Sequence, residues 1–309
     1  EYVYDVNNIN DSPSSIAFIK ARNSDALSSF GDFIAISGVV DEKCAKLIKR
    51  EVSDGIVAFD YTSQALEILK TKKKGKYIIL QGKYTNNYNT EYREINNIAL
   101  CQQSNYETLT YDDLNNVQTK NNIIDNCKKD DLILATITLK YTPSNSIVLA
   151  DKGQVIGVGA GQQNRVDCIK LAGNKAFIFK MRFHDKCINL LNKFKEDVKR
   201  QDRVNAIIKY INNDFLHNEL INWKNLFEEN NNIELLTNDE LSFFKENLDN
   251  IVLSSDAFFP FRDNIDYAQR YGVKYILNPG GSIQDENIIN ACDEYNIFMA
   301  ISNKRFFYH

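Results

Sequence analysis

The sequence has 309 residues, 43% of them hydrophobic and 25% charged, with a formal net charge of −4 at pH 7. This composition is typical of a soluble globular protein with two or three subdomains. No apolar run approaches the ~20 residues that span a membrane, no signal segment opens the chain, and the charge predicts no nucleic-acid surface. The six cysteines lack CxxC pairing. Their spacing favours reduced thiols in the cytoplasm over disulfides or a zinc site.

The first third of the chain predicts alternating helices and strands. Apolar spacing predicts helices at 14–22, 41–50 and 63–69, and strands at 33–39, 56–59 and 77–80. Such alternation is typical of a parallel or mixed sheet with helices on its faces. The polar stretch from about 83 to 130 predicts a connecting region with one strand at 98–101.

The middle of the chain predicts a helix, a hairpin and a second helix. Asp130 and Asp131 open the first helix, at 130–140, and would complement its dipole. Asp151-Lys152-Gly153 is a hairpin signal between strands at 146–150 and 154–158. The remaining predicted helices are 163–171, 186–200, 203–212, 219–228, 237–247, 264–271 and 282–295, with strands at 273–277 and 297–302.

The most unusual run is SSDAFFPFRDNID at 254–266, where three phenylalanines and a proline stand among charged side chains. It is too apolar for a solvated loop and too charged for a core strand, and Pro260 bars a regular helix. An aromatic wall beside Arg262 and a carboxylate would suit the binding of a flat heterocycle. The alternative is a kinked connection with buried phenylalanines.

Several long runs resemble one family, in the same order along nearly the whole chain. They are SSFGDFIAIS (28–37), REVSDGIVAFDY (50–61), LKYTPSNSIVLADKGQ (139–154), IGVGAGQQNRVDCIKLAG (156–173), SSDAFFPFRDNID (254–266) and the C-terminal run from 276 to 309. They resemble the transformylase half of the AICAR formyltransferase/IMP cyclohydrolase family. The resemblance implies an α/β fold of two cytidine-deaminase-like units without zinc. The first, truncated unit would be 1–89, a connecting subdomain 90–181 and the second unit 182–309.

The resemblance also implies a reaction in purine biosynthesis. A formyl group would move from 10-formyltetrahydrofolate to the exocyclic amine of 5-aminoimidazole-4-carboxamide ribonucleotide (AICAR), on the route to IMP. That amine is a poor nucleophile, so the site must align the reactants, manage protons and stabilise an oxyanion. A homodimer and a monovalent cation such as potassium near Asp256 are implied as well. The alternative is a non-catalytic remnant that binds ligands or assembles a dimer.

The residues that match family contacts to the nucleotide are Gly31, Asp54, Lys73, Asn145, Arg165, Phe258 and Arg305. Asn145 is also implied as a catalytic group that orients the amine, and His309 as a histidine at the edge of the site. From the residues alone, Asn145 is a turn residue and the glycines after 156 form a weak phosphate-loop candidate. In the full-length parent protein, alanine at Asn145 or Arg165 is expected to cut formyl transfer severely at nearly unchanged melting temperature.

The residues that match the folate pocket are Val166, Asn205, Phe261, Asp263, Ser282 and Ile283. A carboxylate such as Asp263 pairs with the amino-pyrimidine edge of a pterin, although it could equally cap the helix that follows. The family's Lys-His pair for proton transfer is expected upstream of Glu1. The isolated chain is therefore expected to bind folate better than nucleotide and to turn over negligibly.

Overall fold

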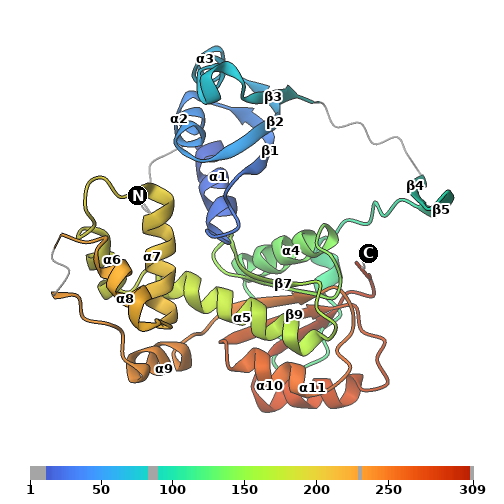
Figure 1. Ribbon diagram of the computed structural model, residues 1–309. Helices are drawn as coiled ribbons and strands as arrows, with labels where there is room; N and C mark the ends of the chain where they lie inside the picture. The colour runs from blue at the N-terminus through green and yellow to red at the C-terminus, as the bar shows by residue number, and fades with distance from the viewer. Residues whose placement is uncertain (1–11, 83–89, 229–231, 307–309) are drawn as a thin grey trace. The chain divides into compact units, whose positions relative to one another are not determined.

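The computed structural model describes residues 12–82, 90–228 and 232–306. Within these ranges the chain forms two compact units (Figure 1): unit 1 holds Ile19–Ser29 and the residues from Leu109 onward, and unit 2 holds the residues up to Phe18 and Phe30–Thr108. Both units contain sheets with helices between their strands, so the predicted α/β class is confirmed. No helix in the described ranges is long and apolar enough to cross a membrane.

Unit 2 is built on a parallel sheet in the order β1-β2-β3. Its elements are β1 (Asp32–Val40), α2 (Glu42–Arg50), β2 (Ser53–Tyr61), α3 (Ser63–Lys70), the 3₁₀ turn η2 (Lys72–Gly75) and β3 (Ile78–Gln81), after α1 (Pro13–Asn23). The side chains of Asp41 and Thr62 cap α2 and α3 by accepting from Cys44 N and Ala65 N. The helices and strands predicted for this part are confirmed to within a few residues.

The strand register gives this sheet one buried and one open face. Ile34 pairs with Ile56, and both are buried on one face. The opposite face carries Phe33, Ala35, Val57, Phe59, Ile78 and Leu80, which we call the open face. Phe33, Phe59, Ile78 and Leu80 are each 47–49% exposed. Parallel sheets are usually covered on both faces, so an exposed apolar face is unusual.

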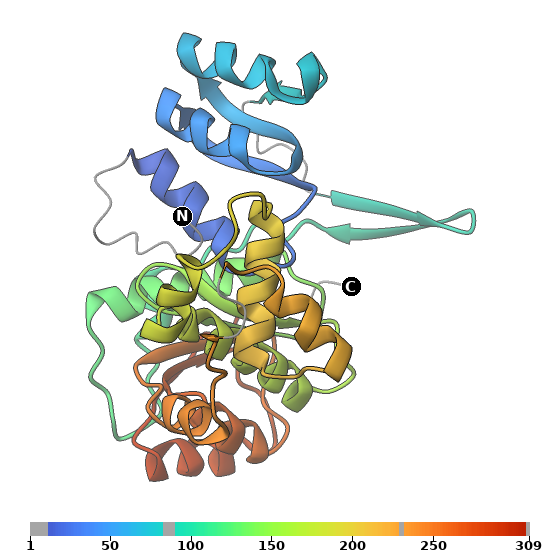
Figure 2. The ribbon, with the colours of Figure 1, turned by 60° about the vertical axis from the view of Figure 1, so that its left-hand side comes forward.

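Unit 2 also contains an antiparallel hairpin of β4 (Thr90–Ile95) and β5 (Ile98–Gln103), a two-stranded ribbon in Figure 2. Asn96 and Asn97 join the strands with φ of 51° and 63°, the positive values that a tight hairpin turn requires. The prediction of a strand at 98–101 is confirmed. Strand β4 was not predicted, because its sequence TEYREI lacks the apolar run that marks the start of β5.

Unit 1 is built on a mixed sheet in the order β10-β9-β8-β6-β7. Its strands are β6 (Ser146–Ala150), β7 (Val155–Ala160), β8 (Ile251–Ser255), β9 (Val273–Asn278) and β10 (Phe298–Ile301). Helix α4 (Asn126–Lys140), after the 3₁₀ turn η3 (Tyr111–Leu114), covers one face. The other face is covered by α5 (Arg165–Met181), α10 (Asp263–Gln269) and α11 (Asp285–Glu294), as Figure 1 shows.

The glycines of β7 let α5 lie directly against the sheet. A Cβ at Gly157 would lie 2.1 Å from the Ala172 carbonyl oxygen, and one at Gly159 would lie 2.0 Å from that of Cys168. Any larger side chain would push the helix away. The glycine run is therefore a packing surface, and α5 continues beyond the predicted end at residue 171 to Met181.

The remaining helices of unit 1 form a cluster around Tyr210, Trp223 and Phe227. They are α6 (Asp185–Leu191), α7 (Arg200–Asn212), α8 (His217–Lys224) and α9 (Asn238–Glu246). The predicted helix at 186–200 is too long, since α6 ends at Leu191 and Phe194 forms a bridge with Phe227.

The run at 254–266 begins in a buried strand that the sequence did not predict. Ser254 and Ser255 end β8 and are 1% and 2% exposed. Their hydroxyls have partners inside the protein: Thr136 Oγ1 donates to Ser254 Oγ at 2.9 Å, and Ser255 Oγ donates to the Ala257 carbonyl at 2.7 Å. The expectation that this run is too charged for a core strand is thus wrong for its first residues, because internal hydrogen bonds compensate their polarity.

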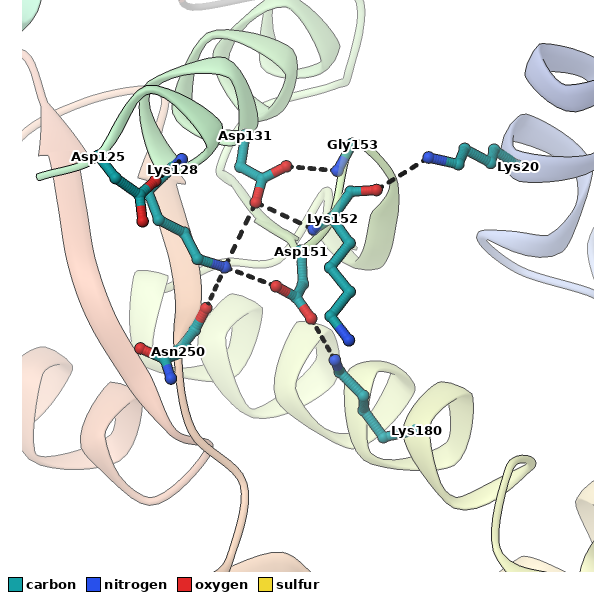
Figure 3. Close-up of polar contacts among 9 residues, drawn as sticks. All are labelled: Lys20, Asp125, Lys128, Asp131, Asp151, Lys152, Gly153, Lys180 and Asn250. Atoms are coloured by element: carbon teal, nitrogen blue, oxygen red, sulfur yellow. Dashed lines mark hydrogen bonds and ion pairs between the residues drawn. The ribbon is translucent and has the colours of Figure 1, made fainter. Parts of the chain in front are cut away.

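An ionic network anchors the β6–β7 hairpin (Figure 3). Helix α4 begins at Asn126 after the cap Asp125, so Asp131 lies in its second turn and not at the predicted N-terminus. Asp131 instead accepts from the hairpin amides Lys152 N at 3.0 Å and Gly153 N at 2.6 Å. The predicted turn is confirmed, with φ of 54° and 68° at these two residues.

Asp151 is the centre of this network. Lys128 Nζ donates to Asp151 at 2.5 Å and to the Asn250 carbonyl at 2.6 Å, and Lys180 from α5 pairs with the other oxygen of Asp151. Burial acts to raise the pKa of Asp151, but the hydrogen bonds from Lys128 and Lys180 outweigh it and hold the pKa below its usual value. The ionised carboxylate therefore stabilises the fold.

We predict that Asp151→Asn lowers the free energy of unfolding by about 2–4 kcal/mol at pH 7, because it leaves Lys180 without a counter-charge and Lys128 with only the longer pair to Asp131, at 3.4 Å. A depressed folded-state pKa contributes stability that is present above the unfolded pKa of about 4 and is lost as pH falls through the folded value. Wild-type stability should thus fall more steeply with acid than that of the variant.

Urea unfolding between pH 7 and pH 3 measures both effects. The matched control is Glu42→Gln, which removes an exposed ion pair to Lys46 and should cost less than about 1 kcal/mol. Equal losses in the two variants would contradict the anchoring role of Asp151.

Candidate active site

One edge of the unit 1 sheet collects chain segments that are far apart in the sequence. Strands β8, β9 and β10 are parallel and end at this edge, and antiparallel β6 begins there, since Ile147 pairs with Ser255. Strand β7 ends at the same edge, because Ser146 pairs with Ala160, and α5 begins shortly after it. Ligands of α/β sheets bind outside the carboxyl ends of the strands, so this edge is the expected place for a site.

Arg165 is the hub of this edge. It is the first residue of α5, after the cap Asn164, and is 7% exposed. Its Nη2 donates to Asp256 Oδ1 at 2.8 Å and to Asn145 Oδ1 at 3.1 Å, while Nη1 donates to the Phe258 carbonyl at 3.0 Å. The structure thus brings three predicted nucleotide contacts, Asn145, Arg165 and Phe258, into one hydrogen-bonded group.

Asp256 is the functional residue whose importance the sequence understated. It is 0% exposed, and its Oδ2 accepts from Ser146 N at 3.1 Å while Oδ1 binds Arg165. Sequence reasoning named it only as a neighbour of a cation. The available signal was weak, since two serines separate Asp256 from the apolar run Ile251-Val252-Leu253.

The orientation of the Asn145 amide is determined by its neighbours. Its oxygen accepts from Arg165 and its nitrogen donates to the Gln162 carbonyl at 3.0 Å. Because an amide has two acceptor lone pairs and two N–H groups, one of each is left to meet a ligand. Cys168 Sγ donates to the Asn145 carbonyl at 3.1 Å, and burial raises the pKa of this thiol to about 11. Cys168 therefore stays a thiol and is no nucleophile.

Arg305 and Phe258, two predicted nucleotide contacts, lie close together. The Arg305 guanidinium lies 5.8 Å from the centre of the Phe258 ring, in the range of a cation–π contact. Arg305 also lies next to Gly281: a Cβ added to this glycine would be 3.7 Å from Arg305 Nη2. The predicted His309 lies outside the described residues.

The turn after β9 presents two of the predicted folate residues. Asp285 Oδ2 accepts from Gly281 N at 2.7 Å and from Ser282 N at 3.1 Å, so a carboxylate holds the loop closed. Helix α11 begins at Asp285, three residues after the predicted Ser282. Next to Ser282, the side chain of Ile283 is fully exposed.

The other predicted folate residues lie in different places. Val166 follows Arg165 in α5, and Asp263 is the exposed first residue of α10, where it accepts from its neighbour Asn264 at 3.0 Å. Phe261 is 64% exposed. Asn205 lies apart on α7, which packs in the separate cluster around Trp223, and accepts from Gln201.

The proposed aromatic wall with Arg262 is only partly formed. Phe259 is 1% exposed and belongs to the core, and Arg262 forms two hydrogen bonds to the Glu294 carboxylate, at 2.9 and 2.5 Å. Arg262 is therefore occupied by α11 and gives no free cation to a ligand. Phe258 and Phe261 remain available to a ligand. The run is thus partly an aromatic wall and partly a kinked connection with a buried phenylalanine.

The remaining predicted nucleotide contacts, Gly31, Asp54 and Lys73, belong to unit 2. Gly31 has φ +73° and donates to the Val52 carbonyl at 2.9 Å, just before β1. Asp54 near the start of β2 pairs with Lys73 Nζ at 2.5 Å. Since β1 and β2 both begin there, these residues share the amino edge of the three-stranded sheet.

Comparison of the sequence with known proteins identifies the family to which the chain belongs. The profile of the AICARFT/IMPCHase bienzyme family matches residues 9–175, more than half of the chain. The chain belongs to this family. A bifunctional purine biosynthesis protein PurH from Leptospira biflexa is 28% identical over 294 residues, which cover 95% of this chain and 44% of that protein. The chain thus spans less than half the length of this AICARFT/IMPCHase relative.

The buried pair changes the expectation that Arg165→Ala leaves the melting temperature unchanged. We predict that Arg165→Met costs about 3–5 kcal/mol of unfolding free energy, because Asp256 would stay buried without a counter-charge. Adding Asp256→Asn should recover part of this loss, since the uncompensated charge is removed. Thermal unfolding of the single and double variants measures both the loss and its partial recovery.

The control is Arg262→Met, which breaks the partly exposed ion pairs to Glu294 and Asp266 and should lower the melting temperature clearly less than Arg165→Met does. If Arg165→Met behaved like this control, the pair with Asp256 would be too weak to organise the site.

Proposed function

We propose that this chain forms part of the formyl-transfer site that moves a formyl group from 10-formyltetrahydrofolate to AICAR in purine biosynthesis. The single observation that carries the proposal is the buried group of Asn145, Arg165 and Asp256 at the carboxyl edge of the unit 1 sheet. Family membership supports the same reaction. The cytidine-deaminase-like ancestry of the units at 1–89 and 182–309, the connecting subdomain between them and a cytoplasmic location remain parts of this proposal.

Asn145 is proposed as the residue that meets the reacting amine. The second lone pair of its Oδ1 can accept from the amine of AICAR, and its second N–H can donate to the formyl oxygen as negative charge develops. Arg165 keeps the amide in this orientation through the 3.1 Å hydrogen bond. Arg165 therefore acts first as a positioning residue, since within the described residues three of its N–H bonds are already directed at protein oxygens.

The ligand contacts are proposed for each unit by itself. In unit 1, Phe258 offers an aromatic face to the imidazole and Arg305 a cation to the phosphate. In unit 2, the nucleotide contacts of Gly31, Asp54 and Lys73 stay proposals from the family resemblance. On the folate side, Val166, Phe261, Asp263, Ser282 and Ile283 offer apolar surface and one carboxylate for a pterin. Asn205 and His309 stay proposals from the family resemblance.

A monovalent cation near Asp256 stays a proposal from the family resemblance. Ser146 Oγ is buried and has no hydrogen-bond partner among the described residues, so it is a candidate oxygen ligand for a hard cation. Both carboxylate oxygens of Asp256 already accept hydrogen bonds, from Arg165 and from Ser146 N. No group of three His, Cys, Asp or Glu residues that could hold a transition metal occurs in the described ranges.

We predict that Asn145→Ala, made in a protein that includes the Lys-His pair expected upstream of Glu1, lowers formyl transfer by ~10²-fold or more, because one oriented hydrogen-bond donor is commonly worth that much. The measurement is the formation of tetrahydrofolate from 10-formyltetrahydrofolate in the presence of AICAR, with the melting temperature of each variant as a check on folding. Asn189→Ala, on an exposed position of α6, is the control and should keep full activity.

Three outcomes are informative. Near-normal transfer in Asn145→Ala would overturn the assignment. Binding of both ligands without turnover, in a wild-type protein that includes the upstream Lys-His pair, would support the alternative, a ligand-binding remnant. Tight nucleotide binding with no folate binding would contradict the proposed folate residues.

A homodimer is proposed from the open face of unit 2. Four large apolar side chains at 47–49% exposure on one parallel sheet are a surface that needs a partner. We predict that Phe59→Glu weakens dimerisation by at least ~10-fold, because burying a carboxylate in an apolar interface costs several kcal/mol.

Light scattering over a dilution series measures the dimer. Phe243→Glu is the matched control, since Phe243 is 70% exposed on α9 and outside the open face. A wild-type chain that stays monomeric at micromolar concentration would contradict the dimer, and equal effects of both variants would contradict the role of the open face.

A further inference from the structure

A cavity of about 360 Å³ lies in unit 1, between residues 24–28 and the helices α5 and α7. Its walls are mainly apolar and include Leu171, Ile178 and Ile208. This volume falls within the range of about 300–1,000 Å³ in which small-molecule sites occur. The cation of this cavity is far from the candidate active site, because Arg165 begins α5 whereas Arg182 follows its last residue, and 17 residues of helix span about 25 Å. Leu171, the lining residue of α5 nearest to Arg165, lies six positions along the helix, or about 9 Å.

The cavity contains more positive than negative charge. Two cations, Lys175 and Arg182, and one carboxylate, Asp25, belong to its lining. Lys175 Nζ and Asp25 Oδ2 pair at 2.7 Å, so this carboxylate is already neutralised. The negative end of α5 offsets only about half of a charge at Arg182. The cavity therefore keeps an excess of positive charge.

Arg182 is buried without enough partners. It is 5% exposed, its Nη2 donates to the Asn23 carbonyl at 2.9 Å, and its Nε has no hydrogen-bond partner among the described residues. Burial lowers the pKa of this guanidinium to about 10, and the charge of Asp25 opposes the shift only in part. A buried arginine with so few hydrogen bonds to the protein is costly, and an anion in the cavity would compensate it by pairing with a nitrogen of the guanidinium other than the enclosed Nε.

We propose that this cavity binds a small organic monoanion, a carboxylate with a flat or branched apolar body. The carboxylate would pair with Arg182, and the apolar walls would bury the body. The Phe179 ring, 5.0 Å from the Arg182 guanidinium carbon, holds the cation in place from one side. A monoanion matches the single excess charge, whereas a dianion such as a phosphate monoester would leave a negative charge among apolar side chains.

The test uses benzoate as the probe and benzamide, a neutral molecule of the same shape, as its control. Ligand-detected NMR titrations on the whole chain should show benzoate binding at least ~10-fold tighter than benzamide, since a hydrogen bond to a charged group is worth about 1.5–3 kcal/mol. Addition of AICAR or 10-formyltetrahydrofolate should not displace benzoate, which separates this site from the proposed formyl-transfer site.

Two variants test the location. Arg182→Met removes the cation at similar length, and Ile178→Trp fills the cavity without a change of charge. Both should lose benzoate binding, whereas Arg270→Met on the exposed end of α10 should keep it. If Arg182→Met does not fold, Ile178→Trp still decides the location. Equal binding of benzoate and benzamide, displacement by AICAR, binding that survives both cavity variants, or no benzoate binding would each overturn the proposal.

Discussion

The ion pair between Arg165 and Asp256 is the interaction on which the candidate site depends. Both side chains are almost inaccessible to water, so neither charge can be removed alone without a large cost. The same guanidinium holds the Asn145 amide and the carbonyl of Phe258. The buried charges of Arg165 and Asp256 thus orient the residues that are proposed to contact the substrate. A site built in this way is organised before any ligand arrives.

Much of the fold follows from local patterns, and the exceptions have clear causes. The βαβ alternation of unit 2 has a short-range signal in the sequence, the periodic spacing of apolar residues. The turn at Lys152-Gly153 has another, a glycine at a position where the backbone needs a positive φ. Strand β8 was missed because the two serines at its end read as polar, and only their distant partners, such as Thr136, make them suitable for a core. Nothing in the local sequence of residues 254–256 indicates those partners.

The candidate site was predictable mainly through resemblance to a family. Taken alone, Asn145 has the pattern of a turn residue, and Arg165 that of the first residue of a helix. Their importance follows from the pairing of Arg165 with Asp256, which is 91 positions away in the sequence. Residue pairs at such separations come together only through the order of strands in the sheet, and periodicity carries no information about that order.

The glycine contacts of β7 have a consequence for how the two ends of α5 communicate. Backbone lies against backbone at Gly157 and Gly159, with no side chains between strand and helix that could rearrange. A helix seated in this way cannot slide or tilt in small steps, because its carbonyl oxygens would collide with the strand. Occupation of the cavity beside Arg182 should therefore leave the affinity at the Arg165 edge unchanged, so that the two binding free energies add without cooperativity.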